Sequence, residues 1–311
     1  MNNHPKCPFF GRCGGCAYDF TSPSYRESKA SLLTEIPLTS APIWVAPGVR
    51  RRGDFCFSGN QFGFFESHTK NIIPLDNCPN LVPEINRILP SVSKLPWAGS
   101  GSCLITSCEN GIDIAINSTV PYVTSEFRSA ASGVGAIRVT WNGRLVVETA
   151  TPIIKFGDTS VEYPSGAFLQ PSISGADALR ELVTSRASGF NRIADLFCGL
   201  GNFTFALNAD GFDIVGTGVT RDLFKKPLTL GMLAGYDCVV MDPPRAGARA
   251  QCDVLAQSNV RRVIYVSCNP GTFMRDLSIL QNGGYVLQEL IPVDQFVGSH
   301  HWELFATFDK K

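Results

Sequence analysis

The feature that most constrains the fold is a set of four apolar runs in the second half of the chain, at residues 193–197, 236–242, 263–267 and 285–289. These runs are rich in Val, Ile, Leu and Tyr, and they lack the polar alternation of a half-exposed strand. They are therefore typical of strands buried on both faces. Helical patterns separate them, so the second half is expected to form an α/β domain around a largely parallel sheet.

The first half of the chain has a different pattern. From residue 43 to about 161, short alternating runs are broken by Gly, Pro and Asn, which predicts a mostly antiparallel β region. Helices are expected at 23–36, where Ser22 would be the N-cap, near 82–89, and at 174–187, just before the change in pattern.

The length of 311 residues fits two domains, and we expect them to cover residues 1–165 and 166–311. Lys+Arg and Asp+Glu both number 27, so the formal charge is zero, which argues against a broad electrostatic grip on nucleic acid. A local patch such as Arg50-Arg51-Arg52 could still contact RNA, although three adjacent arginines are more often a solvated turn. No apolar run is long enough to span a membrane and the N-terminus lacks the apolar part of a signal peptide, so we expect a cytoplasmic monomer.

Four of the eleven cysteines form a distinctive set. Cys7, Cys13 and Cys16 lie within ten residues of one another, and the glycines between them allow a tight loop in which three thiolates can converge. Cys78, also in a turn next to proline, is the best candidate for a fourth ligand. Three clustered cysteines with a distant fourth favour an iron–sulfur cluster, whereas structural zinc more often uses two close pairs. Zinc and unliganded surface thiols remain the alternatives.

A glycine-containing loop follows the first apolar run. The segment Asp195-Leu-Phe-Cys-Gly-Leu-Gly-Asn202 ends a predicted strand and opens a helix, so Gly199 and Gly201 would let a nucleoside approach the backbone at the carboxyl edge of the sheet. The dinucleotide fingerprint needs a third glycine where this chain has Thr204. A nicotinamide cofactor is therefore disfavoured.

Two further motifs end the next two strands. Asp242 is followed by two prolines, which make a stiff shelf at the edge of the sheet. Cys268, in Ser-Cys-Asn-Pro, lies on a tight polar turn at the same edge, which is the setting of a nucleophile rather than of a structural thiol. Near the end of the chain, Glu303 follows two histidines and a tryptophan and supplies a carboxylate.

The order of these motifs carries a resemblance to a known family. Asp-Leu-Phe-Cys-Gly-x-Gly-Asn, Asp-Pro-Pro-Arg-Ala-Gly, Ser-Cys-Asn-Pro and His-x-Glu-Leu, together with Phe-Leu-Gln at 168–170, resemble the S-adenosylmethionine-dependent RNA uridine-5-methyltransferases. The four-cysteine set resembles the iron–sulfur branch of that family, which acts on 23S ribosomal RNA. The resemblance implies a Rossmann-like class I methyltransferase domain, preceded by the mostly antiparallel β domain and an N-terminal iron–sulfur loop.

The resemblance also implies roles for individual residues. The thiolate of Cys268 would add to C6 of a flipped-out uridine, and Glu303 would remove the proton from C5. S-adenosylmethionine would be bound by five residues, namely Gln170, Phe197, Asn202, Asp222 and Asp242. A [4Fe-4S] cluster would be held by the four clustered cysteines, Cys7, Cys13, Cys16 and Cys78.

One segment departs from the family pattern. An acidic residue that binds the ribose hydroxyls of the methyl donor is expected about 20 residues past the glycines, but residues 214–220 contain no acidic residue. The interval from Asn202 to Gly235 is also too short for two strands and three helices, so we expect one strand–helix unit to be missing after Leu207. A compact variant, in which Asp213 or Asp222 substitutes for the missing acid, is the alternative.

This departure leaves competing functions open. The chain could be a degenerate RNA-binding relative that has lost part of the donor site, or an enzyme that modifies transfer RNA instead of ribosomal RNA. An iron–sulfur electron carrier is a third possibility, but it would leave the motifs around Cys268 and Glu303 without a purpose.

Overall fold

The computed structural model describes residues 6–311 and contains two large sheets. The larger sheet has eight strands, which are, in spatial order, β1 (Ile43–Trp44), β16 (Tyr285–Asp294), β17 (Glu303–Lys310), β15 (Arg262–Ser267), β14 (Cys238–Met241), β11 (Ile193–Leu196), β12 (Asp210–Asp213) and β13 (Val219–Thr220). Only β17 is antiparallel to its neighbours. The four apolar runs are strands of this one sheet, as the sequence pattern predicts.

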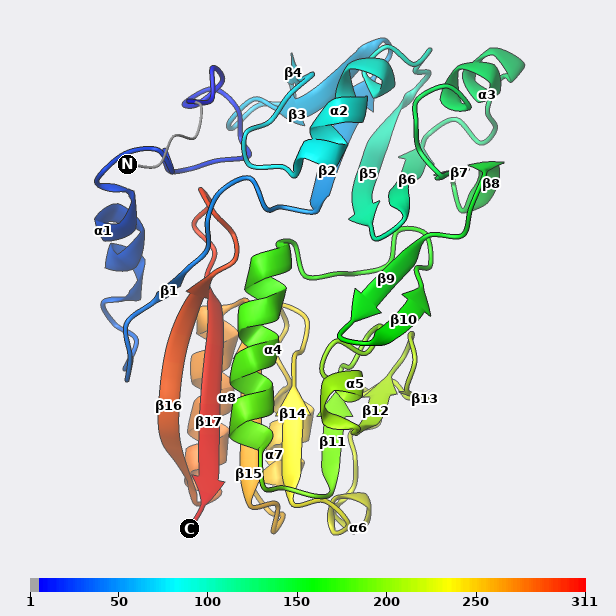
Figure 1. Ribbon diagram of the computed structural model, residues 1–311. Coiled ribbons are helices and arrows are strands. Elements are labelled where there is room, and N and C mark those ends of the chain that lie inside the picture. The colour runs from blue at the N-terminus through cyan, green and yellow to red at the C-terminus, as the bar shows by residue number, and fades with distance from the viewer. Residues whose placement is uncertain (1–5) are drawn as a thin grey trace.

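Helices cover both faces of the large sheet. Figure 1 shows α4 (Ile173–Ala187) on one face, and α7 (Arg249–Leu255) and α8 (Pro270–Asn282) on the other. The expected helix at 174–187 is thus confirmed, and it begins at Ser172, whose hydroxyl accepts a hydrogen bond from the Gly175 amide over 3.1 Å. Because helices cover both faces, the side chains of strands such as β11 and β14 are fully buried, which explains why polar and apolar residues do not alternate in them.

The segment after Leu207 differs in part from the expectation. The strand β12 is present, pairs with β11 and ends at Asp213, so the prediction that this strand is missing is wrong. What the segment lacks is a helix: only residues 214–218 connect β12 to β13, although the two strands are parallel. Parallel neighbours ordinarily need a crossover of a dozen or more residues. The helices α5 (Thr204–Leu207) and α6 (Leu230–Leu233) are single turns, which accounts for the short interval.

The second sheet lies in the first half of the chain. Its seven strands are, in spatial order, β4 (Ile72–Pro74), β3 (Gln61–Phe65), β2 (Arg52–Ser58), β5 (Ser100–Cys108), β6 (Gly111–Ser118), β7 (Arg138–Trp141) and β8 (Arg144–Glu148). All pairs are antiparallel except β6 with β7, which are joined through α3 (Ser125–Ala131). This arrangement agrees with the mostly antiparallel β region expected from the sequence. The helix expected near 82–89 is α2 (Pro83–Val92), and a hairpin of β9 (Ile153–Phe156) and β10 (Thr159–Glu162) leads toward α4.

The segment before β1 contacts both sheets: the cysteine loop lies against Phe65 and Glu66 at the end of β3, whereas the helix that follows it packs against the large sheet (Figure 1). The helix expected at 23–36 is shorter, with α1 at Tyr25–Ala30 and one 3-10 turn at Ser31–Leu33. The Lys29 ammonium, which is fully buried, donates to the Asp294 carboxylate at the end of β16 and to the carbonyl oxygen of Phe296. The Tyr25 hydroxyl donates to Asp294 over 2.7 Å and accepts from the Gly298 amide over 2.9 Å.

The loop before β17 is held by further contacts with this N-terminal segment. The amides of Ala17 and Tyr18 both donate to the carbonyl oxygen of Gly298, over 2.7 and 2.9 Å. No helix among residues 6–311 is long and apolar enough to cross a membrane.

Candidate active site

The three sequence motifs meet at the carboxyl edge of the large sheet. The glycine loop follows β11, Asp242 follows β14, and Cys268 follows β15. Phe197, Gly199 and Gly201 all have positive φ, which turns the chain sharply from the strand into α5. A Cβ at Gly199 would have nothing within 4 Å, so the loop leaves open space beside its backbone.

A cavity of about 920 Å³ opens at this edge. Its lining includes all seven candidate catalytic and donor-binding residues, which are Gln170, Phe197, Asn202, Asp222, Asp242, Cys268 and Glu303. Gln170 lies in the loop before α4, Phe197 and Asn202 lie in the glycine loop, and Glu303 is the first residue of β17. The other three follow the ends of β13, β14 and β15. The structure therefore brings together every one of these side chains that the sequence singled out.

A chain of hydrogen bonds crosses the inner wall of the cavity. Gln170 donates from Nε2 to the Asp242 carboxylate, and Gln295 donates from Nε2 to Gln170 Oε1, each over 2.7 Å. The same Nε2 of Gln295 also donates to Glu303 Oε2 over 2.7 Å. Gln295, the first residue after β16, was not singled out from the sequence. Its only sequence signal is its position eight residues before Glu303.

Burial sets the charge state of the reactive groups. Loss of solvent raises the pKa of Asp242 to about 7, with a further contribution from the Asp195 carboxylate, while the hydrogen bond from Gln170 opposes the rise. Burial, with the charge of Asp242, also raises the pKa of Glu303 well above its usual value. The Cys268 thiol is half-buried, and burial raises its pKa to about 11, helped by the charges of Glu303 and Asp242 and opposed by Arg245. In the free protein near neutral pH, Cys268 is therefore a thiol.

The acid missing from residues 214–220 is found one residue earlier. Asp213 ends β12 and lines the cavity, and its Oδ2 accepts a hydrogen bond from the Gly199 amide over 2.8 Å. Its Oδ1 accepts from the Ile214 amide over 2.6 Å. The sequence named Asp213 only as a substitute acid in a compact variant, because the fixed spacing from the glycines does not allow for a shortened connection. Its position as the last residue of a strand next to the glycine loop matches the place that a ribose-binding acid occupies.

Asp222 lies at the outer part of the same cavity, after β13. Its carboxylate accepts from the amides of Phe224 and Lys225 over 3.1 and 3.2 Å and pairs with the Lys225 ammonium. The rings of Phe197 and Phe224 lie 5.4 Å apart beside it. An acid next to two aromatic rings can receive a planar base with exocyclic amino groups.

Two buried polar atoms near the glycine loop have no hydrogen-bond partner: Asp195 Oδ1 and Asn202 Nδ2. Asp195 binds the Thr204 hydroxyl through its other oxygen over 2.6 Å, and Asn202 accepts from Arg180 over 3.2 Å through its amide oxygen. Unpartnered buried polar atoms are uncommon in folded proteins. Asn202 lines the cavity, so its unpartnered amide fits a polar ligand such as S-adenosylmethionine, whereas Asp195 lies behind the lining.

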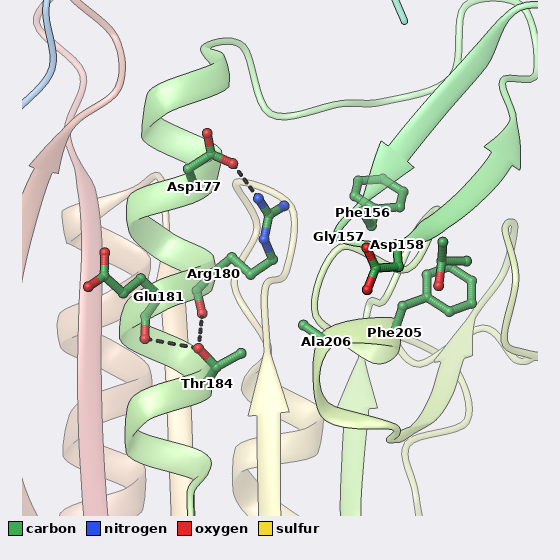
Figure 2. A pocket seen from close by; sticks show the side chains of 10 residues that line it. Phe156, Gly157, Asp158, Asp177, Arg180, Glu181, Thr184, Phe205 and Ala206 are labelled. Carbon is green, nitrogen blue, oxygen red and sulfur yellow. Dashed lines mark hydrogen bonds and ion pairs between the residues drawn. The ribbon is translucent and has the colours of Figure 1, made fainter.

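A shallower groove lies outside this cavity, between α4 and the hairpin of β9 and β10. Figure 2 shows Asp177 and Arg180 on the side of α4 that faces Asp158 and Phe205, whereas the side chain of Glu181 points away from them. Arg180 pairs with Asp177 on the same helix and reaches Asn202, so its charge is already satisfied within the protein. The groove therefore supports the wall of the main cavity.

The four clustered cysteines are neighbours but do not form a closed ligand set. The thiols of Cys13, Cys16 and Cys78 have raised pKa values, first because of burial and then because of one another's charges, with Cys7 contributing to all three. Among residues 6–311, however, no three His, Cys, Asp or Glu side chains are placed to hold a metal ion. The donor chemistry fits a metal or an iron–sulfur cluster, whereas the arrangement of the thiols does not by itself define one. Six of the other cysteines are buried: Cys56, Cys103, Cys108, Cys198, Cys238 and Cys252.

The three adjacent arginines are not a solvated turn. Arg51 is only 7% exposed and lines the cavity, and burial lowers the pKa of all three guanidinium groups. Arg50 and Arg52 donate to backbone carbonyl oxygens, those of Arg52 and Leu169, over 2.9 Å each. The interpretation as a solvated turn is therefore wrong, because the segment joins the small sheet to the chain that enters α4, whereas contact of these arginines with RNA stays a prediction.

The strand order and the cavity at the carboxyl edge define a class I methyltransferase fold. A transfer RNA (uracil-54, C5)-methyltransferase of Pyrococcus abyssi, solved in complex with S-adenosyl-L-homocysteine, has the same fold, with a TM-score of 0.73 and 18% identity over 91% of this chain and 81% of that one. A model of the tRNA (uracil-5-)-methyltransferase family matches residues 223–311.

Curated relatives extend the match over almost the whole chain. A protein of Rhizobium meliloti named as an RNA methyltransferase is 33% identical over 98% of this chain and 86% of its own length. The 23S rRNA (uracil(1939)-C(5))-methyltransferase of Shewanella denitrificans is 27% identical over 97% of this chain and 82% of its own length. The chain belongs to the tRNA (uracil-5-)-methyltransferase family of S-adenosylmethionine-dependent RNA methyltransferases. The alignment with the Rhizobium protein spans 357 positions, more than the 311 residues here, so that relative has residues with no counterpart in this chain.

Proposed function

We propose that this protein transfers a methyl group from S-adenosylmethionine to C5 of a uridine in RNA, through a covalent adduct between Cys268 and C6. The observation that carries the proposal is the shared cavity, in which a thiol, two buried carboxylates and the glycine loop face one space. A nucleophile, a base and a nucleoside-binding loop are the groups that this reaction requires.

S-adenosylmethionine, when bound, supplies an electrophilic methyl group on a sulfonium. We assign its site to the glycine loop with Gln170, Phe197, Asn202, Asp222 and Asp242, and we add Asp213 as the acid for the ribose hydroxyls. Supporting this assignment are the open space at Gly199 and the unpartnered Asn202 amide. The carboxylates that surround the site would favour a positively charged ligand.

Cys268 provides the nucleophile in this scheme. Its thiolate adds to C6 of the uridine, and the electron pair of the C5–C6 double bond moves onto C5 and the C4 carbonyl as an enolate. The electron pair on C5 would then form the bond to the methyl group, while the electron pair of the S–CH3 bond would stay on sulfur and S-adenosylhomocysteine would leave. Since burial holds the free thiol protonated, its proton must leave before or during the attack. The side chain of Arg245 lowers the pKa of Cys268 and so assists this step.

Glu303 provides the base. Its carboxylate accepts the proton from C5, the electron pair of that C–H bond restores the C5–C6 double bond, and the Cys268 thiolate leaves. Glu303 is 2% exposed and is the first residue of β17, so it is held on a rigid element, away from water. This placement favours proton removal by the side chain rather than by solvent.

We further propose that the RNA is 23S ribosomal RNA, that residues 1–165 contact it, and that Cys7, Cys13, Cys16 and Cys78 hold a [4Fe-4S] cluster. The Shewanella relative acts on 23S rRNA, which supports this target. The Pyrococcus protein acts on transfer RNA, so transfer RNA is the second candidate.

Mass mapping of 5-methyluridine tests the proposed function. We expect ribosomal RNA from cells without this gene to lack one 5-methyluridine, and the purified protein with S-adenosylmethionine to restore it. Loss of the modification from transfer RNA instead would transfer the proposal to that substrate. If neither RNA changes and calorimetry detects no donor binding at millimolar concentration, the chain is a non-catalytic RNA-binding relative.

A further inference from the structure

One buried side chain links the donor side of the cavity to the proposed base. Gln295 is 1% exposed and follows directly after β16. Both hydrogens of its Nε2 are used, one toward Gln170 Oε1 and one toward Glu303 Oε2, each over 2.7 Å. No step assigned above uses Gln295.

The direction of these hydrogen bonds is set by Asp242 at pH values above its pKa of about 7, where it is ionised. An ionised carboxylate can only accept, so Gln170 must then present its NH2 group to Asp242 and its oxygen to Gln295. Gln295 must in turn present its NH2 group, because its own oxygen would face another oxygen. The remaining hydrogen of that NH2 group points to Glu303. The Asp242 carboxylate, beside the proposed methyl-donor site, therefore orients the NH2 group of Gln295 toward Glu303.

Helix α4 leaves room for this arrangement. A Cβ on Gly175 would lie 2.5 Å from Gln295 Cβ and 2.3 Å from the Ser172 hydroxyl, which real side chains do not tolerate. Next to Gln295 in the chain, Asp294 is fixed by Lys29 and Tyr25. The Gln295 side chain is therefore confined on both sides, as a group that orients another group must be.

We infer that Gln295 is a positioning residue, which holds Glu303 as a carboxylate aimed at C5 and ties its orientation to Asp242. The inference rests on the proposed function. It also goes beyond that proposal, because it makes proton removal depend on a side chain that touches neither RNA nor methyl donor.

The electrostatics of the cavity agree with this role. The titratable groups that face Glu303 are Asp242, after β14, and Cys268, after β15, with Arg245 beside Cys268. Burial and Asp242 raise the pKa of Glu303, and the hydrogen bond from Gln295 is the contribution that lowers it. Without Gln295, a smaller fraction of Glu303 is ionised at any given pH. Attack by Cys268 and methyl transfer, which precede proton removal, do not need Glu303 as a base.

The test compares Gln295→Met with Gln288→Met, a matched change at an exposed position of β16. Each variant is given S-adenosylmethionine and either uridine RNA or 5-fluorouridine RNA, from which the base cannot remove the C5 substituent. For Gln295→Met we expect turnover on uridine RNA to fall about 10- to 100-fold, less than the roughly 10²–10⁴-fold of losing a general base because Glu303 remains, and the methylated covalent complex to accumulate. Adduct formation with 5-fluorouridine RNA should stay within about threefold of wild type, and turnover should recover as the pH is raised.

Gly175→Ala provides a second route to the same effect, because it displaces Gln295 without removing it. We expect it to accumulate the same methylated complex, whereas Gln288→Met should behave as wild type. If Gln295→Met turns over uridine RNA like wild type, the inference is wrong. It is also wrong if turnover of uridine RNA and adduct formation with 5-fluorouridine RNA fall equally and the pH profile does not change. If the wild-type protein forms no adduct with 5-fluorouridine RNA, the proposed function fails, and this inference fails with it.

Discussion

Asp213 accepts a hydrogen bond from the backbone amide of Gly199 over 2.8 Å, so the end of β12 is joined directly to the glycine loop after β11. The contact places a carboxylate beside the open part of that loop, although the helix that ordinarily follows this strand is replaced by residues 214–218. The shortened segment therefore retains an acid where the donor ribose would lie.

Replacing this acid should weaken donor binding. We expect Asp213→Asn to lower the affinity for S-adenosylmethionine about 10- to 100-fold, since hydrogen bonds to a charged group contribute about 1.5–3 kcal/mol. Titration calorimetry measures the change. Asp210→Asn, at the exposed start of the same strand, is the control and should leave affinity unchanged. Equal affinities for wild type and Asp213→Asn would remove Asp213 from the donor site.

Cys268 should be required for covalent attachment to RNA. We expect Cys268→Ala to form no complex with 5-fluorouridine RNA that survives denaturation, because no other thiol in the cavity is placed for attack at C6 in our scheme. Cys252→Ala, at a fully buried position of α7, should still form it. The readout is a mobility shift on a denaturing gel, and a complex that persists in Cys268→Ala would refute the assignment of the nucleophile.

Glu303→Gln should separate methyl transfer from release. The amide cannot accept the C5 proton, so a methylated covalent complex with uridine RNA should accumulate, as measured by intact mass. In the wild-type protein, burial raises the pKa of Glu303, so the ionised base becomes more abundant as pH rises. Turnover should therefore increase with pH in the wild type. A pH-independent wild type, or a variant that releases product normally, would exclude Glu303 as the base.

The four clustered cysteines should bind a metal centre together. We expect anaerobically purified protein to contain iron and sulfide, and Cys78→Ala to lose both, because three thiolates do not complete the ligand set of a [4Fe-4S] cluster. Cys56→Ala, at a buried position of β2, should retain them. Elemental analysis distinguishes the outcomes: zinc in place of iron would support the structural zinc alternative, and a metal-free protein would contradict both.

The buried pair Lys29–Asp294 should be important for stability. Both side chains are fully buried, so Lys29→Met leaves an uncompensated carboxylate and should lower the free energy of unfolding by about 3–5 kcal/mol. Lys225→Met removes an exposed partner of Asp222 and should change the free energy of unfolding by less than about 1 kcal/mol. Urea denaturation compares the two, and equal effects would show that the buried pair is not specifically stabilising.

The sequence allowed much of the fold to be predicted because buried parallel strands have a continuous apolar pattern, as in Cys238–Met241. Motifs that end such strands must meet at one edge, which explains why Asp242 and Cys268 could be placed together without coordinates. Asp213 and Gln295 could not be found in the same way. Asp213 could be named only as an alternative to Asp222, because the shortened connection breaks the usual spacing. Gln295 could not be found at all, because its partners are at positions 170 and 303, which no local pattern links.

The contacts between the N-terminal segment and the loop before β17 determine when the site can be completed during synthesis. Tyr25 and Gly298 are separated by 273 residues along the chain, yet they bind each other directly. On the ribosome, α1 cannot contact Asp294 or Gly298 until β16 and the following loop have emerged, whereas residues 12–14 can already contact Phe65, Glu66 and Ser67. Glu303, the proposed base, is thus fixed only after β16, the following loop and β17 have been synthesised, so a nascent chain without these elements would lack a complete candidate site.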